Sequence, residues 1–148
     1  MNTTAKTSGT AGGDDRWSVT RTGCSLLIAR DVAVSPATAI DAFRDTRRWP
    51  DWSPSISAVE SAHRHVREGT RGRVRVAGVW LPFRVTEFSG RRWAWRVAGI
   101  PATGHRVEGY AGVSDRCRVG IEVPIAAAGY VPVCKRALNR FALLVDRA

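Results

Sequence analysis

The stretch VSPATAIDAFRDTRRWPDWSPSISAVE, residues 34 to 60, decides how the rest of the chain is interpreted. Ser35 is a natural N-cap and Pro36 suits the first helical position, and apolar residues follow at helical spacing. We therefore expect one short helix from about Pro36 to Asp45. Two later prolines disfavour helix in the residues that precede them, so at most a turn or two of helix follows. Trp49 and Trp52 fall in that interrupted segment, although a large indole normally belongs in a core or at a binding surface.

The segments on either side of this stretch have the composition of β-strands. Residues 24–34, CSLLIARDVAV, are apolar and β-rich. After the stretch, strand-like runs are separated by short breaks that resemble turns, which indicates antiparallel hairpins. The expected strands cover residues 55–62, 70–77, 79–88, 92–99, 103–110 and 116–123.

The last segment, VPVCKRALNRFALLVDRA, predicts a long amphipathic helix, because its apolar residues recur at i, i+3, i+4 and i+7. An antiparallel sheet has to bury one face, and this helix is the only long element available to cover it. We therefore predict the α+β class: a curved antiparallel sheet of about seven strands around a long C-terminal helix, with one or two short helices after the first strand. Such a sheet leaves a volume between itself and the helix.

The length of 148 residues predicts a single domain, residues 17–148. Residues 1–16 are rich in Thr, Gly, Ala and Ser, and we expect them to form a flexible tail. No stretch approaches the roughly 20 apolar residues of a membrane span, and no signal peptide is recognisable, so we expect a cytoplasmic protein. Either a monomer or a homodimer is compatible with an exposed edge strand.

The formal net charge of +10 raises the question of nucleic-acid binding. Nearly all of the positive charge is arginine, and it is spread along the chain, often alternating with apolar residues as on the exposed side of strands. We therefore expect no nucleic-acid partner. The three cysteines are widely spaced and are expected to be reduced, small core residues. His63 and His65 offer two imidazoles at a strand end, but no Cys cluster joins them, so we expect no metal and no other cofactor.

The chain resembles the START-like superfamily, also called SRPBCC, and within it the polyketide cyclase/dehydrase and lipid-transport branch. The resemblance rests on residues 34–60, on PFRVTEFSGRRWAWRVAG at residues 82–99, and on the amphipathic terminal helix. It implies the helix-grip fold with an internal cavity that binds a hydrophobic or aromatic small molecule. It also implies a cyclase/dehydrase-like enzyme of secondary metabolism that needs no cofactor. The alternative is a non-catalytic carrier or sensor of a lipid, quinone or similar ligand.

The period of two along strands selects candidate residues for this cavity. His105 is the most interesting ionisable side chain, because it shares a face with an apolar neighbour beside tryptophans. It is either a catalytic acid or base or a hydrogen-bonded core residue. Glu87 would face inward if its strand alternates without interruption, as a second catalytic candidate or as the partner of an arginine at the rim. The expected ligand-binding residues are Trp49, Trp52, Phe83, Trp93, Trp95, Val107, Leu138 and Phe141.

The inward-facing residue near the middle of the first predicted strand is either Arg30 or Asp31. Arg30 and Asp31 are consecutive residues of the first predicted strand, so their side chains point to opposite faces. An arginine inside the cavity would bind a carboxylate or polarise a carbonyl group. The sequence does not decide which of the two faces inward.

Overall fold

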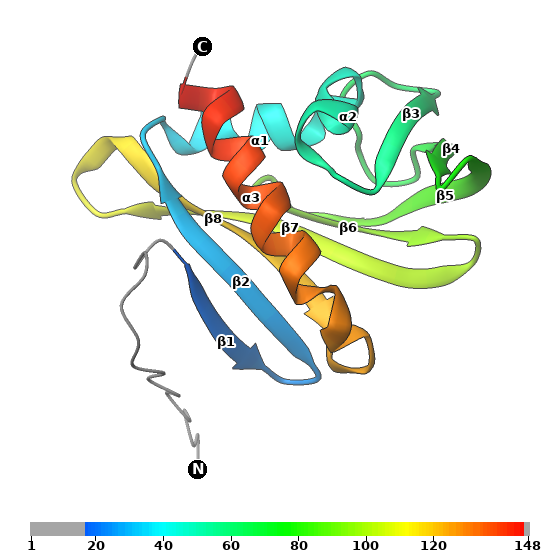
Figure 1. The fold of residues 1–148 in the computed structure, drawn as a ribbon. Coiled ribbons are helices and arrows are strands. Elements are labelled where there is room, and N and C mark those ends of the chain that lie inside the picture. The colour runs from blue at the N-terminus through cyan, green and yellow to red at the C-terminus, as the bar shows by residue number, and fades with distance from the viewer. Residues whose placement is uncertain (1–16, 147–148) are drawn as a thin grey trace.

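The structure is a computed structural model that describes residues 17–146. Figure 1 shows a strongly curved sheet, short helical segments at one end of it, and a long C-terminal helix lying across its concave side. The elements, in chain order, are β1 (Ser18–Thr22), β2 (Ser25–Val32), α1 (Pro36–Arg44), the 3-10 turn η1 (Thr46–Arg48), α2 (Trp49–Trp52), β3 (Ile56–Ser61), β4 (Arg71–Val76), β5 (Val79–Phe88), β6 (Arg92–Val97), β7 (Ile100–Tyr110), β8 (Val113–Pro124), the 3-10 turn η2 (Ile125–Tyr130) and α3 (Val131–Asp146).

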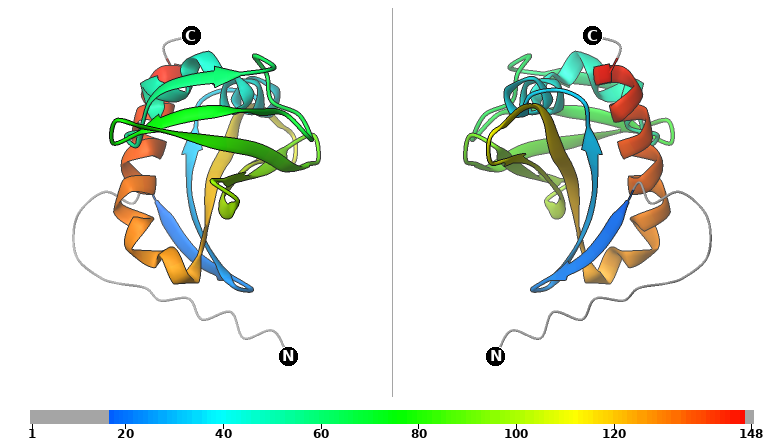
Figure 2. Two further views of the ribbon diagram at one scale, coloured as in Figure 1. Left: turned by 90° about the vertical axis from the view of Figure 1, so that its right-hand side faces the viewer. Right: turned by 90° about the vertical axis from the view of Figure 1, so that its left-hand side faces the viewer.

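The eight strands form one antiparallel sheet in the order β1-β2-β8-β7-β6-β5-β4-β3. The chain returns from one edge to the other through α1 and α2, and the views in Figure 2 show how far the sheet wraps around α3. The predicted α+β class with a curved antiparallel sheet and a long terminal helix is confirmed. The strand count is one higher than expected, because β1 was not recognised; the expected tail at residues 1–16 lies outside the described residues.

Helix α1 forms as the sequence predicts, and side chains cap its start and the start of the turn η1 that follows it. The Ser35 hydroxyl accepts a hydrogen bond from the Thr38 amide at 3.2 Å. At the other end the Asp45 carboxylate accepts from the Arg47 amide at 3.1 Å, which turns the chain into η1. Both caps satisfy backbone donors that a helix leaves unpaired at its start. The chain therefore enters α2 in a fixed direction, with both of its tryptophans buried.

Helix α3 packs its apolar face against the sheet and against α1. Phe141 of α3 stacks on Phe43 of α1 with ring centroids 4.0 Å apart. The buried side chains of the helix are Cys134, Ala137, Leu138, Phe141, Ala142 and Val145. Because burying one such aliphatic or aromatic side chain stabilises a fold by about 1.5–3 kcal/mol, this helix is a major part of the core. Within residues 17–146, the structure has no helix long and apolar enough to cross a membrane.

Candidate functional site: a cavity between the sheet and the C-terminal helix

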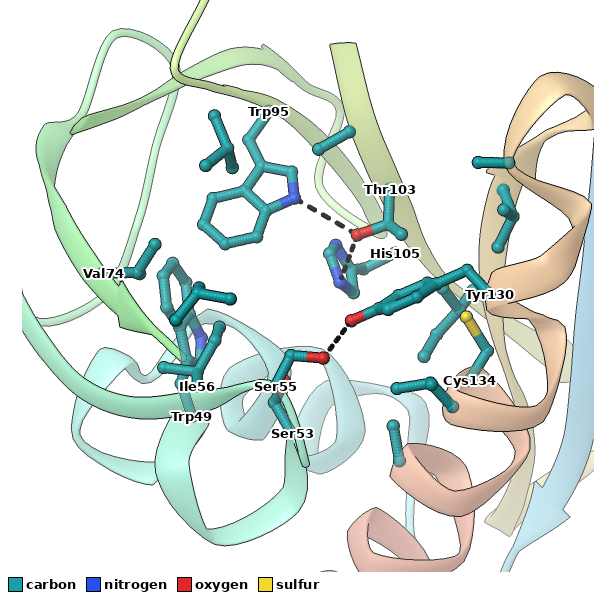
Figure 3. Close-up of a pocket in the computed structure, with 18 of the residues that line it drawn as sticks. Trp49, Ser53, Ser55, Ile56, Val74, Trp95, Thr103, His105, Tyr130 and Cys134 are labelled. Carbon is teal, nitrogen blue, oxygen red and sulfur yellow. Dashed lines mark hydrogen bonds between the residues drawn. The ribbon is translucent and has the colours of Figure 1, made fainter. Parts of the chain in front are cut away.

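A cavity of about 300 Å³ lies between the inner face of the sheet, α2 and the first half of α3. Figure 3 shows its lining, with side chains from α2, the sheet and α3 pointing toward one another. Most of the lining is apolar, and its largest side chains are the four indoles of Trp49, Trp52, Trp93 and Trp95. An apolar cavity with a few polar groups is the usual form of a small-molecule site.

Trp49 and Trp52 form the wall of the cavity that α2 provides. The Trp49 indole nitrogen donates to the Phe43 carbonyl at 2.9 Å, and its ring stacks on Trp93 with centroids 5.4 Å apart. The Trp52 ring packs edge-on against Phe43 at 5.4 Å. The two tryptophans thus close the end of the core and also line the cavity.

His105 lies where the alternation of β7 predicts, on the inner face of the sheet and only 3% exposed. Its ring stacks on Trp93 with centroids 4.0 Å apart and an interplanar angle of 21°. Burial among these rings lowers the pKa of His105 to about 3, against a smaller opposing effect of the Trp93 backbone. Its imidazole is therefore neutral over the physiological pH range.

Thr103 connects His105 to the wall of indoles. The Trp95 indole nitrogen donates to the Thr103 hydroxyl oxygen at 3.2 Å, and this oxygen lies 3.4 Å from Nε2 of His105. Because the oxygen already accepts from the indole, its own proton is available to Nε2. Nδ1 of His105 is buried without a hydrogen-bond partner of good geometry. The group presents a hydroxyl and a neutral imidazole to the cavity.

A second polar pair stands across the cavity, between the loop after α2 and the start of α3. The hydroxyl groups of Ser55 and Tyr130 are hydrogen-bonded to each other, as Figure 3 shows. Burial raises the pKa of the Tyr130 phenol, so it remains a neutral donor at physiological pH. Thr103, Ser55 and Tyr130 were not predicted as site residues. Only Thr103 had a signal in the sequence, since it lies two residues before His105 and so shares its face.

Glu87 is not on the inner face, and the expectation that placed it there is wrong. The register of β5 against β6 shifts between Val85 and Glu87, so the alternation assumed for this strand breaks. The Glu87 side chain is 62% exposed and forms an ion pair with Arg92 on the outer face. The alternative interpretation, a carboxylate paired with an arginine, describes its position.

Four of the residues expected to bind ligand are buried but do not line the cavity: Phe83, Val107, Leu138 and Phe141. Phe83 packs behind Trp49 and Trp95, with ring centroids 5.5 Å from each. An inward-facing side chain can end in solid core as well as at a cavity, and the period of two does not separate these cases.

The open question about the first predicted strand is now decided. Arg30 points toward α3, where its guanidinium donates to the Asn139 side chain at 2.6 Å, but it does not line the cavity. Asp31 faces outward and pairs with Arg116 and with the Tyr110 hydroxyl. Among the residues that the structure describes, none of those lining the cavity is charged.

The remaining histidines and cysteines have other surroundings. His63 bonds to the Thr70 hydroxyl at 3.0 Å, and His65 lies 3.3 Å from the Asp41 carboxylate. Between residues 17 and 146 no group of three or more His, Cys, Asp or Glu side chains is arranged to hold a metal. Cys24 is exposed, contrary to expectation. Cys134 lines the cavity, but burial raises the pKa of its thiol to about 12, which keeps it un-ionised.

Comparison with known proteins agrees with this architecture. The family described as polyketide cyclase/dehydrase and lipid transport matches residues 13–142. This chain belongs to that family. No curated protein sequence matches it.

Solved structures with a similar fold share little sequence with the chain. The protein XoxI from Bacillus cereus superposes with a TM-score of 0.64 at 13% identity, covering 82% of this chain and 95% of that one. A protein from Thermobifida fusca gives a TM-score of 0.64 at 18% identity, with 84% and 94% covered. Ara h 8.0201 gives 0.58 at 12% identity, with 84% and 98% covered. At these identities the likeness concerns the fold alone.

Proposed function

We propose that the chain binds a compact, largely apolar and aromatic small molecule in the cavity between the sheet and α3. The observation that carries the proposal is a cavity walled by four indoles whose polar groups are confined mainly to the Thr103–His105 and Ser55–Tyr130 pairs. A volume of about 300 Å³ is at the low end of the roughly 300–1,000 Å³ of small-molecule sites. It favours a flat ring system over a two-chain lipid, and the two pairs suit oxygen substituents on such a ring.

A cavity-filling variant tests this proposal. Ala137 lines the cavity from α3, so Ala137→Phe places a ring inside it, whereas Leu143→Phe adds a ring on the exposed side of the same helix. We expect hydroxylated naphthoquinones and flavonoids to quench the tryptophan fluorescence of the native protein. Ala137→Phe should weaken that binding at least about tenfold, and Leu143→Phe should leave it unchanged. Equal affinities of the two variants would contradict the proposal.

A second candidate function is catalysis of the cyclase/dehydrase type, and the Thr103–His105 pair favours it. Both residues line the cavity, and Nε2 of His105 is a proton acceptor within 3.4 Å of a hydroxyl group. In such a reaction the cavity would orient a poly-carbonyl chain and His105 would take up a proton. A carrier or sensor would use the same cavity without proton chemistry.

The two functions differ in the behaviour of one variant. His105→Gln keeps the volume of the side chain but removes the imidazole, and His105→Ala removes both. For an enzyme, both variants should abolish turnover of poly-carbonyl substrates while affinity stays within about tenfold. Because the imidazole is neutral well below pH 5, the turnover that depends on it should not vary between pH 5 and 8. Unchanged turnover in His105→Gln would remove His105 from the mechanism.

A role in secondary metabolism, a cytoplasmic location and the oligomeric state stay predictions.

A further inference from the structure

The chain carries one short sequence twice, at two β-hairpin turns. RVAGVW at residues 75–80 joins β4 to β5, and RVAGIP at residues 96–101 joins β6 to β7. The turns also share their backbone: Ala77 and Gly78 have φ of 49° and 79°, and Ala98 and Gly99 have 51° and 75°. Two consecutive positive φ values are the mark of the tight turn that matches the twist of a hairpin.

Both turns lie on the same side of the molecule, at the edge of the cavity. In an antiparallel meander alternate turns share an end of the sheet, and Figure 1 shows both hairpins projecting to the right of the view. Val76 and Val97 line the cavity. Their cross-strand partners continue this apolar surface outward, since Val79 is 56% and Ile100 68% exposed. We call residues 76–79 and 97–100 the two hairpin tips.

The composition of the hairpin tips is not the one that favours a turn in water. Two positive φ values select Asn-Gly or Asp-Gly, because Asn and Asp tolerate this conformation best after glycine. Here the first position is alanine in both tips, in a conformation that costs an L-residue free energy. Neither tip contains a polar side chain. Backbone strain combined with exposed aliphatic side chains is typical of a surface that contacts something else.

The other face of the same hairpins is strongly basic. Residues 69–107 include eight arginines and one acidic residue, Glu87. Three of these arginines are paired with carboxylates, Arg73 with Glu60, Arg92 with Glu87 and Glu122, and Arg106 with Glu108 and Glu122. Arg71, Arg84 and Arg96 are direct cross-strand neighbours on β4, β5 and β6. In the described part of the chain, none of these three has a carboxylate partner. Like charges placed side by side destabilise a sheet, so an anionic partner would relieve them.

We propose that the two hairpin tips dock the protein on an anionic lipid surface, with the tips inserted among the headgroups and Arg75 and Arg96 contacting phosphates. Each arginine directly precedes a tip and lies on the outer face of its strand. Protruding aliphatic points next to basic residues suit a deformable, negatively charged interface. Nucleic acid fits less well, because the exposed residues are aliphatic and the Trp80 ring is covered by the Arg73 guanidinium at 4.5 Å. The cavity edge would face the membrane that holds hydrophobic molecules.

Vesicle flotation tests this proposal with the full chain and without added cavity ligand, so its result is independent of the proposed cavity function. The probes are vesicles of equal parts phosphatidylglycerol and phosphatidylcholine, and vesicles of phosphatidylcholine alone, at low salt. The tip variant is Val79→Ser with Ile100→Ser, and the charge variant is Arg75→Gln with Arg96→Gln. Val113→Ser with Leu143→Ser removes two exposed aliphatic side chains elsewhere, and Arg136→Gln with Arg140→Gln removes two exposed charges from α3.

The native protein should float with the phosphatidylglycerol vesicles and not with phosphatidylcholine alone. The charge variant should bind about thirtyfold more weakly and the tip variant at least about tenfold, whereas both control variants should stay within about threefold. Absence of binding to the anionic vesicles would overturn the proposal, as would equal losses in variants and controls. The proposal would also be overturned if the tip variant kept vesicle binding but lost self-association or DNA binding. The tips would then contact a second copy of the chain or a nucleic acid.

Discussion

Thr103 is the side chain through which a polar ligand would reach His105. Its hydroxyl oxygen accepts from the Trp95 indole and lies beside Nε2 of His105, so one small group connects an indole, an imidazole and the cavity. A ligand oxygen that enters this network would hydrogen-bond to groups that are otherwise poorly satisfied, since Nδ1 of His105 and Nε1 of Trp52 and of Trp93 have no partner among the described residues. Such unmet groups favour a ligand with oxygen substituents over a plain hydrocarbon.

Replacing Thr103 by valine should separate these two kinds of ligand. Thr103→Val keeps the shape but removes the hydroxyl, so binding of a hydroxylated ring system should weaken about tenfold, the equivalent of about 1.4 kcal/mol. Binding of an unsubstituted aromatic hydrocarbon of the same size should not change. Isothermal titration of the two ligands measures both values. Thr86→Val, on β5 and outside the cavity, is the control. Parallel losses for both ligands would mean that Thr103 acts only through packing.

Single residues also show where the alternation of side chains along a strand predicts a position correctly and where it does not. The alternation along β7 placed His105 correctly, because that part of the strand pairs without a register shift. The same rule failed for Glu87, where one shift reversed the face. The sequence pattern likewise could not distinguish side chains that line the cavity from side chains packed in the core. Phe141, for example, faces inward but is covered by Phe43. Tyr130 was missed because its position depends on how η2 turns into α3.

At the scale of elements, short polar segments were the hardest to predict. β1 reads SVTRT and is mostly exposed at the edge of the sheet, so it has no apolar alternation to mark it. The meander and α3 were predicted within a few residues, because each carries a buried stripe and ends at turn residues. The helical connection around α2 was predicted as a turn or two of helix, and this agrees with η1 and α2.

Asp45 should hold this connection together. Its carboxylate is 3% exposed and accepts from Arg64 at 3.1 and 3.2 Å and from the Arg47 amide at 3.1 Å. Asp45→Asn removes the charge opposite Arg64 and should lower the free energy of unfolding by about 1–2 kcal/mol. Asp41→Asn, an exposed carboxylate on α1, should cost less than about 0.5 kcal/mol. Urea unfolding at pH 7 measures both, and similar losses would contradict a special role for Asp45.

The pH dependence of that difference has a defined sign. Burial raises the pKa of Asp45, but the hydrogen bonds from Arg64 and the Arg47 amide together lower this pKa by more. The pKa of Asp45 in the folded protein therefore lies below the ordinary value of 3.8. A lowered folded pKa stabilises the protein above the unfolded pKa, and this contribution is lost as pH falls through the folded pKa. The difference between native protein and Asp45→Asn should therefore be constant at neutral pH and shrink below about pH 4.

The hairpin tips offer a prediction about stability that does not depend on their partner. Ala77 and Ala98 both have positive φ, which costs an L-residue about 1–2 kcal/mol, while glycine costs about 0.5–1 kcal/mol through the entropy of the unfolded chain. Ala77→Gly and Ala98→Gly should therefore each raise the free energy of unfolding by about 0.5–1 kcal/mol. Ala111→Gly, at a turn position whose own φ is not positive, should not stabilise. Chemical denaturation compares the three variants; destabilisation by both tip variants would refute the argument from strain.

At the scale of the whole molecule, a net charge of +10 is arranged without placing a charged side chain in the cavity lining. The arginines of the outer sheet face are partly neutralised, with Glu122 accepting from both Arg92 and Arg106. Within the described residues, the neighbouring Arg71, Arg84 and Arg96 of the hairpin strands have no carboxylate partner, so unpaired positive charge gathers on one part of the surface. The fold thus separates an uncharged cavity from a basic exterior. The order of residues in the sequence could not indicate this cluster of arginines, because strand pairing brings its members together.

An uncharged cavity inside the hydrophobic core couples ligand binding to the stability of the entire fold. The walls come from α2, the sheet and α3 together, so unfolding of the core abolishes the site. A ligand at about one hundred times its dissociation constant should then stabilise the protein by about 2.7 kcal/mol, which corresponds to a rise in Tm of roughly 10 °C for a domain of this size. Differential scanning fluorimetry with the naphthoquinone measures the shift, and Ala137→Phe should reduce it to a few degrees or less while Leu143→Phe retains it. A ligand that quenches tryptophan fluorescence without raising Tm would not bind selectively to the folded chain, which would contradict a site built from all three walls.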